Sequence, residues 1–432
     1  RRTKKMKQTE IVGVEDTLIP EDWEVKRLGE IGEPCMCKRI LKEQTSPTGD
    51  IPFYKIGTFG GIPDAYISRE LFEQYKEQYN YPKKGTLLLS AAGTIGRVVV
   101  FDGKDSYFQD SNIVWIDNDE TKVTNDFLFY CYSRMQWKTE EGGIVSRLYN
   151  ANLKSTSFIA PKSLAEQQRI AKAFSDVDAL ISTTEKLIKK KKNIKQGAMQ
   201  NLLTGKKRLP GFGSQTKPPT YKQTELGPIP EDWEVKTLGE LGSFKNGISK
   251  PSEDFGFGSP FVNLMDIFGI TKISETNHLG LINSNIIEQN TYSLKEGDVL
   301  FVRSSVKPEG VGLTTVIKKD LDKTVYSGFI LRFREIGNEL TTDFKEYVFY
   351  NKGFRDSLIS SSTVSANTNI NQPALKNLII VYPSSKEEQT AIANVLSSMD
   401  KEIETLNTKL EKYRNLKTAM MQQLLTGKIR LV

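Results

Sequence analysis

The chain contains one framework twice, and this internal repeat constrains its fold more than any other feature. Residues 19–30 read IPEDWEVKRLGE and residues 229–240 read IPEDWEVKTLGE, so that a single position differs, and KQTE stands upstream of both. A second repeated segment opens with EQQRIAKAFSDVD at Glu166 and EQTAIANVLSSMD at Glu388, and it ends in LLTGKKRL and LLTGKIRL. The sequence therefore predicts two related units in tandem.

The segments between the repeats have diverged. GTLLLSAA at residues 85–92 and GDVLFVRS at 297–304 still match in residue type, and residues 153–161 and 375–383 lead into the second repeat in the same register. Little else between the repeats is similar. We infer that one unit was duplicated, that the repeated segments kept a common structural role, which we call the frame, and that the segments between them then acquired different functions.

Each second repeat predicts a long helix of roughly 39 residues. The helices are expected to begin near Glu166 and Glu387, and Gly205 and Gly427 to follow their ends. Apolar residues alternate in spacings of four and three, as in a coiled coil, and Thr184, Lys191, Lys195 and Lys417 interrupt the pattern. The predicted stripe consists of Ile170, Phe174, Val177, Ile181, Ile188, Leu202, Ile392, Leu396, Met399, Ile403, Leu406, Leu410, Met420 and Leu424.

Pairing of the two helices is favoured over packing of each helix on its own domain, because an unpaired helix would leave most of its stripe in water. We expect the pair to be antiparallel. A parallel pair would force the linker, about 17 residues long, to run back along a helix of roughly 58 Å. The prediction is a spacer with one domain at each end and an approximate two-fold axis.

The expected division of the chain is an extension at 1–14, domains at 15–162 and 227–384, helical spacers at 163–209 and 385–432, and a linker at 210–226. Both domains are predicted to be α+β, because strand-like runs alternate with short helical ones. The predicted strands cover 86–90, 97–101, 113–116, 298–303 and 329–333, and the predicted helices 124–136 and 342–358. The strand order is not predictable from these runs.

Composition excludes several classes of protein. Hydrophobic residues make up 38% and charged residues 26% of 432 residues, which suits folded domains, and no apolar run reaches membrane-helix length. Residues 1–10 are polar, so we expect no secretory signal, and without an initiator Met we expect the numbering to begin inside a longer chain. The three cysteines fit neither a disulfide framework nor a zinc site, which favours a reducing cytoplasm.

The single histidine, His278, argues against most catalytic sites. A Ser-His-Asp, Cys-His or zinc hydrolase site would have to be built on it. It stands in the polar stretch TNHLG without a nucleophile motif nearby. We favour a surface-loop histidine.

Two unlike domains on a rigid spacer are suited to reading two short DNA sites at a fixed separation. The net charge of +7 permits binding to a polyanion. Small, hydroxyl and amide side chains mixed with Arg and Lys contact phosphates and base edges, although ordinary surface loops contain the same residues. The candidate DNA-binding residues are Lys55, Thr58, Ser90, Thr94, Arg97, Arg147, Asn150, Asn152, Asn263, Arg303, Ser304, Ser305, Lys307, Ser361, Thr363, Asn367 and Asn369.

The doubled arrangement resembles the specificity (S) subunits of Type I restriction–modification enzymes. The resemblance covers nearly the whole chain and rests on IPEDWEV, on the segments at Gly85 and Gly297, on the Leu-x(7)-Pro lead-in and on the helix from E-Q-x-x-I-A to LLTGK. It implies two target-recognition domains, each reading one half of a bipartite, asymmetric site in double-stranded DNA. Residues 90–97 and 303–307 match the DNA-facing loop of the family.

The same resemblance implies the partners. Two adenine-specific DNA methyltransferase (modification) subunits would dock on the central helices, and ATP-dependent restriction subunits would join them. S-adenosylmethionine, ATP and Mg are expected on those partners, and no cofactor, metal or membrane is expected for this chain. It would be a non-catalytic cytoplasmic subunit.

Two alternatives remain. The triplets Glu24-Val-Lys26 and Glu234-Val-Lys236, with Asp16, Asp22 or Asp232 nearby, could hold a metal at a nuclease site, although entry to each domain with Trp23 and Trp233 as packing anchors is favoured. Walker A, dinucleotide-binding and adenine-methylation motifs are missing from the sequence. The second alternative is a coiled-coil scaffold that binds only protein, and the lysine run at 189–192 is compatible with either function.

Overall fold

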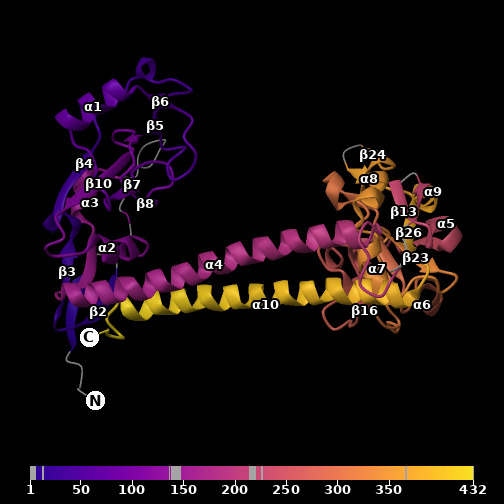
Figure 1. Ribbon diagram of the computed structural model, residues 1–432. Helices are drawn as coiled ribbons and strands as arrows, with labels where there is room; N and C mark the ends of the chain where they lie inside the picture. Colours follow the sequence, from indigo (N-terminus) through magenta and orange to yellow (C-terminus); the bar gives the residue numbers. More distant parts are fainter. Residues whose placement is uncertain are drawn as a thin grey trace. The chain divides into compact units, whose positions relative to one another are not determined.

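The computed structural model describes residues 6–11, 14–135, 137, 147–213, 220–224, 227–364 and 367–431, with side chains from residue 18 onward (Figure 1). The chain forms two compact units. Unit 1 comprises Arg1–Glu185 and Lys409–Val432, and unit 2 comprises Lys186–Thr408. Each unit contains one sequence domain together with parts of two long helices, α4 (Leu164–Leu202) and α10 (Lys386–Leu424). Both helices have 39 residues, close to the predicted length.

Unit 1 is built on an antiparallel sheet in the order β4-β10-β7-β8 and a three-stranded sheet in the order β6-β5-β9. Two strand pairs, β1-β2 and β3-β11, complete it. The strands are β1 (Met6–Ile11), β2 (Val14–Pro20), β3 (Trp23–Arg27), β4 (Gly32–Met36), β5 (Ile51–Tyr54), β6 (Tyr66–Ile67), β7 (Leu87–Ser90), β8 (Val98–Val100), β9 (Tyr107–Phe108), β10 (Ile113–Asn118) and β11 (Ser157–Pro161). The short helices are η1 (Leu28–Glu30), η2 (Lys42–Gln44), α1 (Arg69–Gln78), α2 (Asn125–Tyr132) and α3 (Asn150–Ser155).

Unit 2 has a five-stranded sheet in the order β15-β23-β19-β21-β17, two three-stranded sheets, β18-β16-β22 and β20-β25-β24, and the pairs β12-β13 and β14-β26. The strands are β12 (Tyr221–Thr224), β13 (Gly227–Pro230), β14 (Trp233–Thr237), β15 (Gly242–Asn246), β16 (Phe255–Val262), β17 (Lys272–Ile273), β18 (Gly280–Ile282), β19 (Val299–Val302), β20 (Ser304–Ser305), β21 (Thr314–Ile317), β22 (Val325–Tyr326), β23 (Ile330–Glu335), β24 (Thr363–Val364), β25 (Thr368–Asn369) and β26 (Ile379–Pro383). The short helices are α5 (Leu238–Leu241), η3 (Ser252–Asp254), η4 (Leu264–Asp266), α6 (Ile286–Thr291), η5 (Pro308–Gly310), α7 (Thr342–Val348), α8 (Lys352–Ser360) and α9 (Gln372–Asn377).

The two domains share one frame despite their divergent sequences. The order β4-β10-β7-β8 in unit 1 corresponds to β15-β23-β19-β21 in unit 2. In each unit a small sheet combines one antiparallel pair (β5-β6, β16-β18) with one parallel pair (β5-β9, β16-β22). The strand after IPED pairs in each unit with the strand that leads into the long helix. The predicted α+β class and internal repeat are confirmed.

Each core is completed by the end of a helix from the other repeat. In unit 1 the buried cluster around Trp23, Ile170 and Phe174 includes Leu424 and Leu425. In unit 2 the corresponding cluster contains Trp233, Ile392 and Leu396 with Leu202 and Leu203. Burial of this apolar area is the main force that attaches the LLTG segments.

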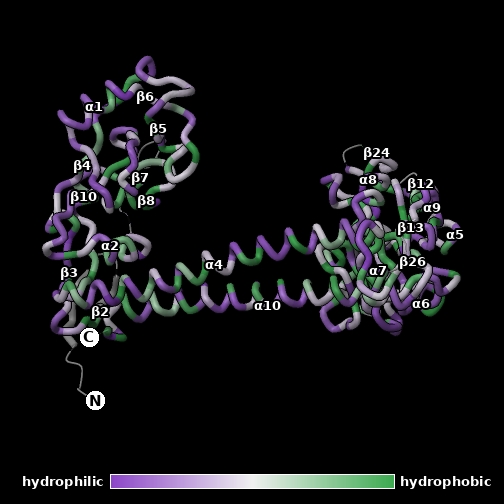
Figure 2. The backbone as a smooth tube through the Cα atoms, in the orientation of Figure 1, coloured by the Kyte–Doolittle hydropathy of each residue, from purple (hydrophilic) through white to green (hydrophobic). Residues whose placement is uncertain are grey.

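The predicted apolar stripe is turned away from solvent. Ile170, Phe174, Val177, Ile188, Leu202, Ile392, Leu396, Ile403, Leu410 and Leu424 are buried, whereas Ile181, Met399, Leu406 and Met420 are half-buried. Apolar residues recur between polar ones along both helices (Figure 2).

The paired stretches run in opposite directions within each unit. In unit 1, Asp178 pairs with Lys417 and Glu185 with Arg414. In unit 2, Lys191 pairs with Glu402 and Lys195 with Asp400. As the number rises along α4 it falls along α10, which is consistent with the predicted antiparallel arrangement.

The structure differs from the predicted elements at several points. The helix predicted at 342–358 is divided into α7 and α8, because the side chain of Asn351 accepts a hydrogen bond from Gly353 and caps a new helix. α2 ends at Tyr132, and Gln136 lies outside the described residues. β12 lies in the stretch expected to be a linker, whose residues 214–219 and 225–226 are also outside the description. Among the described helices none is both long and apolar enough to cross a membrane.

Candidate nucleic-acid interface

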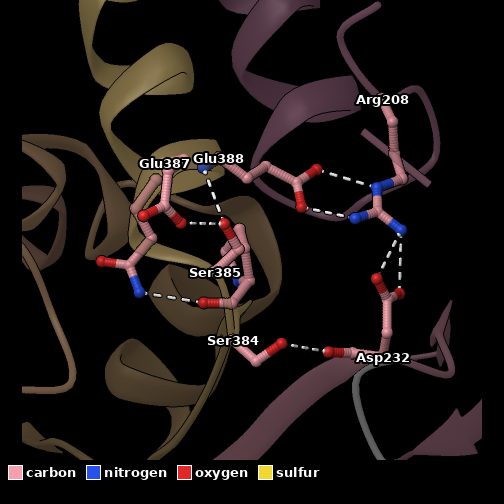
Figure 3. Close-up of polar contacts among 8 residues, drawn as sticks. Arg208, Asp232, Ser384, Ser385, Glu387 and Glu388 are labelled. Atoms are coloured by element: carbon pink, nitrogen blue, oxygen red, sulfur yellow. Dashed lines mark hydrogen bonds and ion pairs between the residues drawn. The ribbon is translucent and has the colours of Figure 1, made fainter. Parts of the chain in front are cut away.

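An arginine that follows α4 joins the start of α10 to the segment before β14 in unit 2 (Figure 3). The guanidinium of Arg208 donates from Nε and Nη2 to the carboxylate of Glu388 at 2.8 and 2.5 Å, and from Nη1 to both oxygens of Asp232 at 2.8 Å. The Glu388 side chain is only 1% exposed. The bidentate geometry satisfies a buried charge that would otherwise be costly, and the hydrogen bonds to Glu388 raise the pKa of Arg208.

Unit 1 repeats this arrangement with Glu166 of α4 and with Asp22 and Arg430, which lie near the two ends of the chain. Arg430 donates to Glu166 at 2.5 and 2.6 Å and to Asp22 at 2.8 and 2.6 Å. The turns that carry these arginines pass close to the IPEDW segments. A Cβ at Gly427 would lie 2.7 Å from Pro20, and one at Gly205 2.4 Å from Pro230. The residues that the two repeats share therefore form the same ion-pair cluster twice. We call it the clamp: Arg208, Asp232 and Glu388 in unit 2, and Arg430, Asp22 and Glu166 in unit 1.

The glutamine that follows each of these glutamates ties the helix start to its domain. In unit 1 the Gln167 amide accepts from the Thr124 backbone at 2.9 Å and donates to the Pro161 carbonyl at 2.8 Å. In unit 2, Gln389 accepts from Thr341 at 2.8 Å and donates to Pro383 at 2.9 Å. Both glutamines are fully buried. The E-Q pair of the repeat is therefore structural.

The lysines that interrupt the stripe have specific partners. In unit 1, Lys417 pairs with Asp178 at 2.6 Å, Asp178 accepts from the Tyr130 hydroxyl at 3.1 Å, and the ammonium lies 5.7 Å from the centre of the Tyr130 ring. In unit 2, Lys195 pairs with Asp400, which accepts from the Tyr347 hydroxyl at 3.0 Å. Each triad joins two helices and one domain.

Three predicted segments of domain 1 meet beyond the end of β7. The guanidinium of Arg97 donates to the Phe59 carbonyl at 3.0 Å, which joins the loop at 90–97 to the turn at 55–61. Ala92 forms an antiparallel bridge with Arg147. Thr94, Arg97 and Arg147 are exposed.

Ser90 is a correction to the predicted set. Its side chain is 2% exposed. Its hydroxyl donates to the Thr94 carbonyl at 2.5 Å and accepts from the Arg97 backbone at 2.8 Å. Because both bonding directions are used inside the loop, Ser90 shapes the loop and is not placed to contact DNA.

Of the other predicted residues of domain 1, Lys55, Thr58 and Asn152 are half-buried and Asn150 is exposed. Lys55 is paired with Asp64 at 2.8 Å, and the Thr58 hydroxyl accepts from the Lys55 backbone at 3.1 Å. Asn150 is exposed at the start of α3, whereas Asn152 is half-buried within it. These residues stay predictions.

Two predicted segments of domain 2, residues 303–307 and 361–369, meet in the small sheet β20-β25-β24. Ser304 pairs with Asn369, which also pairs with Thr363. Arg303 precedes this sheet and is exposed, as are Lys307, Ser361, Thr363 and Asn367. A shallow hollow of about 290 Å³ beside Arg303 is lined by Asn246, Leu331, Asn371, Gln372 and Pro373. Asn263 is exposed and caps η4 by accepting from Leu264 at 2.7 Å.

Both domains have exposed cationic side chains in their predicted DNA-binding loops. Among the described residues, no carboxylate lies within 4.0 Å of the cationic groups of Arg97, Arg147, Arg303 or Lys307. Within the described part of the chain, the guanidinium of Arg303 donates only to the Gly328 carbonyl, at 3.3 Å. Such cations are free to bind phosphates and base edges.

The geometry favours packing over a nuclease site at the E-x-K triplets. Lys26 lies in β3 and pairs with Glu24 at 2.6 Å, whereas Asp22 and Asp232 are held by the clamp arginines. The side chain of Asp16 lies outside the described part. No group of three metal-binding side chains is found within that part. His278 is exposed in a loop.

Comparisons with known proteins agree on a single family. The family model described as "Type I restriction modification DNA specificity domain" matches residues 20–195 and 230–412. The chain is 57% identical over 165 residues to the putative type I restriction enzyme specificity subunit S.HindORF215P of Haemophilus influenzae, a match that covers 38% of this chain and 43% of that protein. It is 27% identical over 425 residues to the MjaVIII specificity subunit of Methanocaldococcus jannaschii, covering 95% and 94% of the two chains.

Two solved structures share the fold. The S subunit of a Type I restriction–modification system from M. genitalium aligns with a TM-score of 0.55 at 14% identity, covering 93% of this chain and 96% of that one. A chain from a structural study of complex assembly and conformational transition of the type I R-M system gives 0.54 at 17% identity, covering 95% and 99%.

Proposed function

This chain belongs to the Type I restriction–modification DNA specificity family, and we propose that it reads an asymmetric, bipartite site in double-stranded DNA with one domain for each half-site. In this proposal the chain itself performs no catalysis. Two adenine-specific methyltransferase subunits and ATP-dependent restriction subunits bind to it and supply S-adenosylmethionine, ATP and Mg chemistry.

One observation carries the proposal: a single frame presents two different sets of loop residues. The strand orders, clamps and triads recur in both units, whereas the loops beyond β7 and β19 differ in sequence. Those loops contain Arg97 and Arg303, which have no carboxylate partner among the residues that the structure describes. A duplicated frame with divergent cationic loops is what recognition of two unlike half-sites requires.

Exposed apolar residues on the helices support the docking of partner subunits. In unit 1, Leu180 and Leu416 are 45% and 46% exposed, and in unit 2, Leu187 and Ile194 are 38% and 46% exposed. None of these side chains belongs to the stripe that joins the helices. An interface core of aliphatic side chains would bury them.

Duplex binding and methylation mapping test the function together. We expect the complex with its modification subunits to bind duplex DNA with an affinity whose logarithm falls linearly with the logarithm of salt concentration. Sequencing that detects methylated adenine should find one bipartite motif that disappears from the host genome when the gene is deleted. A scaffold without DNA reading would bind no duplex, alone or in the complex, and the motif would persist.

A further inference from the structure

Backbone hydrogen bonds place residues of the two domains at equivalent positions. In domain 1, Leu148 donates to the Ala91 carbonyl at 2.9 Å, and Ala91 donates to the Asn112 carbonyl at 2.8 Å. In domain 2, Ile370 donates to Arg303 at 3.0 Å, and Arg303 donates to Phe329 at 2.9 Å. Arg303 therefore occupies the place of Ala91, and Phe329 the place of Asn112.

The neighbouring residues extend this correspondence. The antiparallel bridge between Ala92 and Arg147 in domain 1 corresponds to the pairing of Ser304 with Asn369 in domain 2. In domain 1 the cationic residue, Arg147, lies on the segment that pairs with the loop after β7. In domain 2 the cationic residue, Arg303, lies on the segment that directly follows β19. Equivalent backbone positions present different donor patterns.

Phe329 is the most distinctive residue of this set. Its side chain is 60% exposed. Its backbone is fixed on both sides, because Gly328 donates to the Ile248 carbonyl at 2.7 Å, and the Phe329 carbonyl accepts from Arg303. The turn therefore presents the ring to solvent instead of burying it. The equivalent Asn112 is half-buried, and its Oδ1 is enclosed.

The charge around Phe329 identifies the class of ligand. The adjacent Arg303 guanidinium has no carboxylate partner among the described residues, and it donates to the carbonyl of Gly328, next to the ring. An exposed aromatic side chain on a fixed backbone, beside a guanidinium without a carboxylate partner among the described residues, matches two neighbouring base edges, one with an apolar group and one with hydrogen-bond acceptors. In the major groove, thymine presents its C5-methyl group and guanine presents O6 and N7.

We propose that Phe329 is a specificity-determining residue that contacts the C5-methyl group of a thymine in the half-site read by domain 2, next to the base bound by Arg303. The inference rests on the proposed function. We expect this methyl contact in one half-site only, because domain 1 has Asn112 at the equivalent position.

Replacing thymine by uracil in the duplex isolates this contact, since only the methyl group is removed. We expect one such replacement in the half-site of domain 2 to weaken binding by the complex with modification subunits roughly fourfold, the factor expected for one methyl-sized group. Phe329→Ala should weaken binding to the thymine duplex by at least as much. This variant should bind the thymine duplex and the uracil duplex with the same affinity. Uracil in the other half-site should have no such effect on either protein.

Ile336→Ala is the matched control. Ile336 is 79% exposed and follows the other end of β23, the strand that Phe329 precedes. This variant should keep the full difference between thymine and uracil. If Phe329→Ala retains that difference, or if the half-site contains no thymine on either strand, the inference is wrong while the proposed function stands. Failure of the unaltered complex to bind any duplex would overturn both.

Discussion

Lys417 of α10 lies 2.6 Å from the carboxylate of Asp178 on α4, and the Tyr130 hydroxyl of domain 1 donates to the same carboxylate. A lysine at a stripe position would usually weaken a helix pair. Here its charge is compensated, and its ammonium also lies over the Tyr130 ring. The corresponding Lys195, Asp400 and Tyr347 repeat the arrangement in unit 2. The lysines that interrupt the stripe therefore help to attach each domain to its helices, through an aspartate that also binds a tyrosine of the domain.

Removal of the lysine tests that role. Lys417→Ala should lower the stability of unit 1 by about 1 kcal/mol, because Asp178 loses its cation in a partly screened site. Lys412→Ala is the control, since Lys412 is exposed on the same helix. Chemical denaturation of both variants provides the measurement. Equal stability of the two variants would contradict the attachment role.

Removal of the clamp arginine should have a larger effect. Arg430→Ala leaves the carboxylate of Glu166, 1% exposed, without its guanidinium, and loss of one partner from a buried pair costs about 3 to 5 kcal/mol. Hydrogen exchange should accelerate in the peptide at 19–30. The nearly identical peptide at 229–240 is an internal control, because Arg208 still holds it.

A second substitution separates the charge from the packing. Arg430→Ala combined with Glu166→Gln removes the unpaired charge and should recover part of the lost protection. If protection at 19–30 is unchanged in Arg430→Ala, or falls equally at 229–240, the clamp does not act as described.

The same clamp predicts a dependence on pH. The hydrogen bond from Arg430 lowers the pKa of Asp22 below the ordinary value of an aspartate. A carboxyl group whose pKa is depressed in the folded state contributes stability above its unfolded pKa, near 3.9, and loses it as pH falls through the lower folded value. Asp22→Asn should therefore be less stable than the unaltered protein at pH 6. In urea denaturation from pH 6 to pH 3 the difference should shrink, and a constant difference would exclude this linkage.

The sequence predicted the duplicated parts of the fold more closely than the divergent ones. The spacing of apolar residues and the Leu-Thr-Gly endings located both long helices, because these signals are local. The strand order depends on contacts between distant segments, so that the correspondence of β4-β10-β7-β8 with β15-β23-β19-β21 became visible only in three dimensions.

The candidate site shows the same limit. Arg97 and Arg303 were identified by residue type, and they are exposed in loops at equivalent sheet edges. Ser90 has an equally suitable residue type, but its hydroxyl is used within its own loop. Phe329 was assigned to a strand, and only the backbone bond from Arg303 places it at the interface. Identity between the two repeats could have identified Arg208 and Arg430 as frame residues.

Arg303 is expected to read one half-site only. Arg303→Ala in the complex with modification subunits should reduce discrimination at one base pair by about 1 to 3 kcal/mol, the range for a bidentate contact to guanine. Sequencing of methylated adenine should then show a relaxed base in the half-site of domain 2. Lys319→Ala is the control, because Lys319 follows the far end of β21. Equal loss at both half-sites would count against the assignment.

The length of the paired helices should set the gap between the half-sites. Deletion of residues 181–194 and 401–414 removes two heptads from each helix and retains the pairs Asp178–Lys417 and Lys195–Asp400. At 1.5 Å per residue this shortens the spacer by roughly 21 Å, which corresponds to about six base pairs of duplex. The methylated motif should keep both half-sites unchanged and tolerate a shorter gap. Deleting only one of the two segments disrupts the register and should abolish methylation, whereas an unchanged gap after the paired deletion would refute the proposed role of the helices as a spacer.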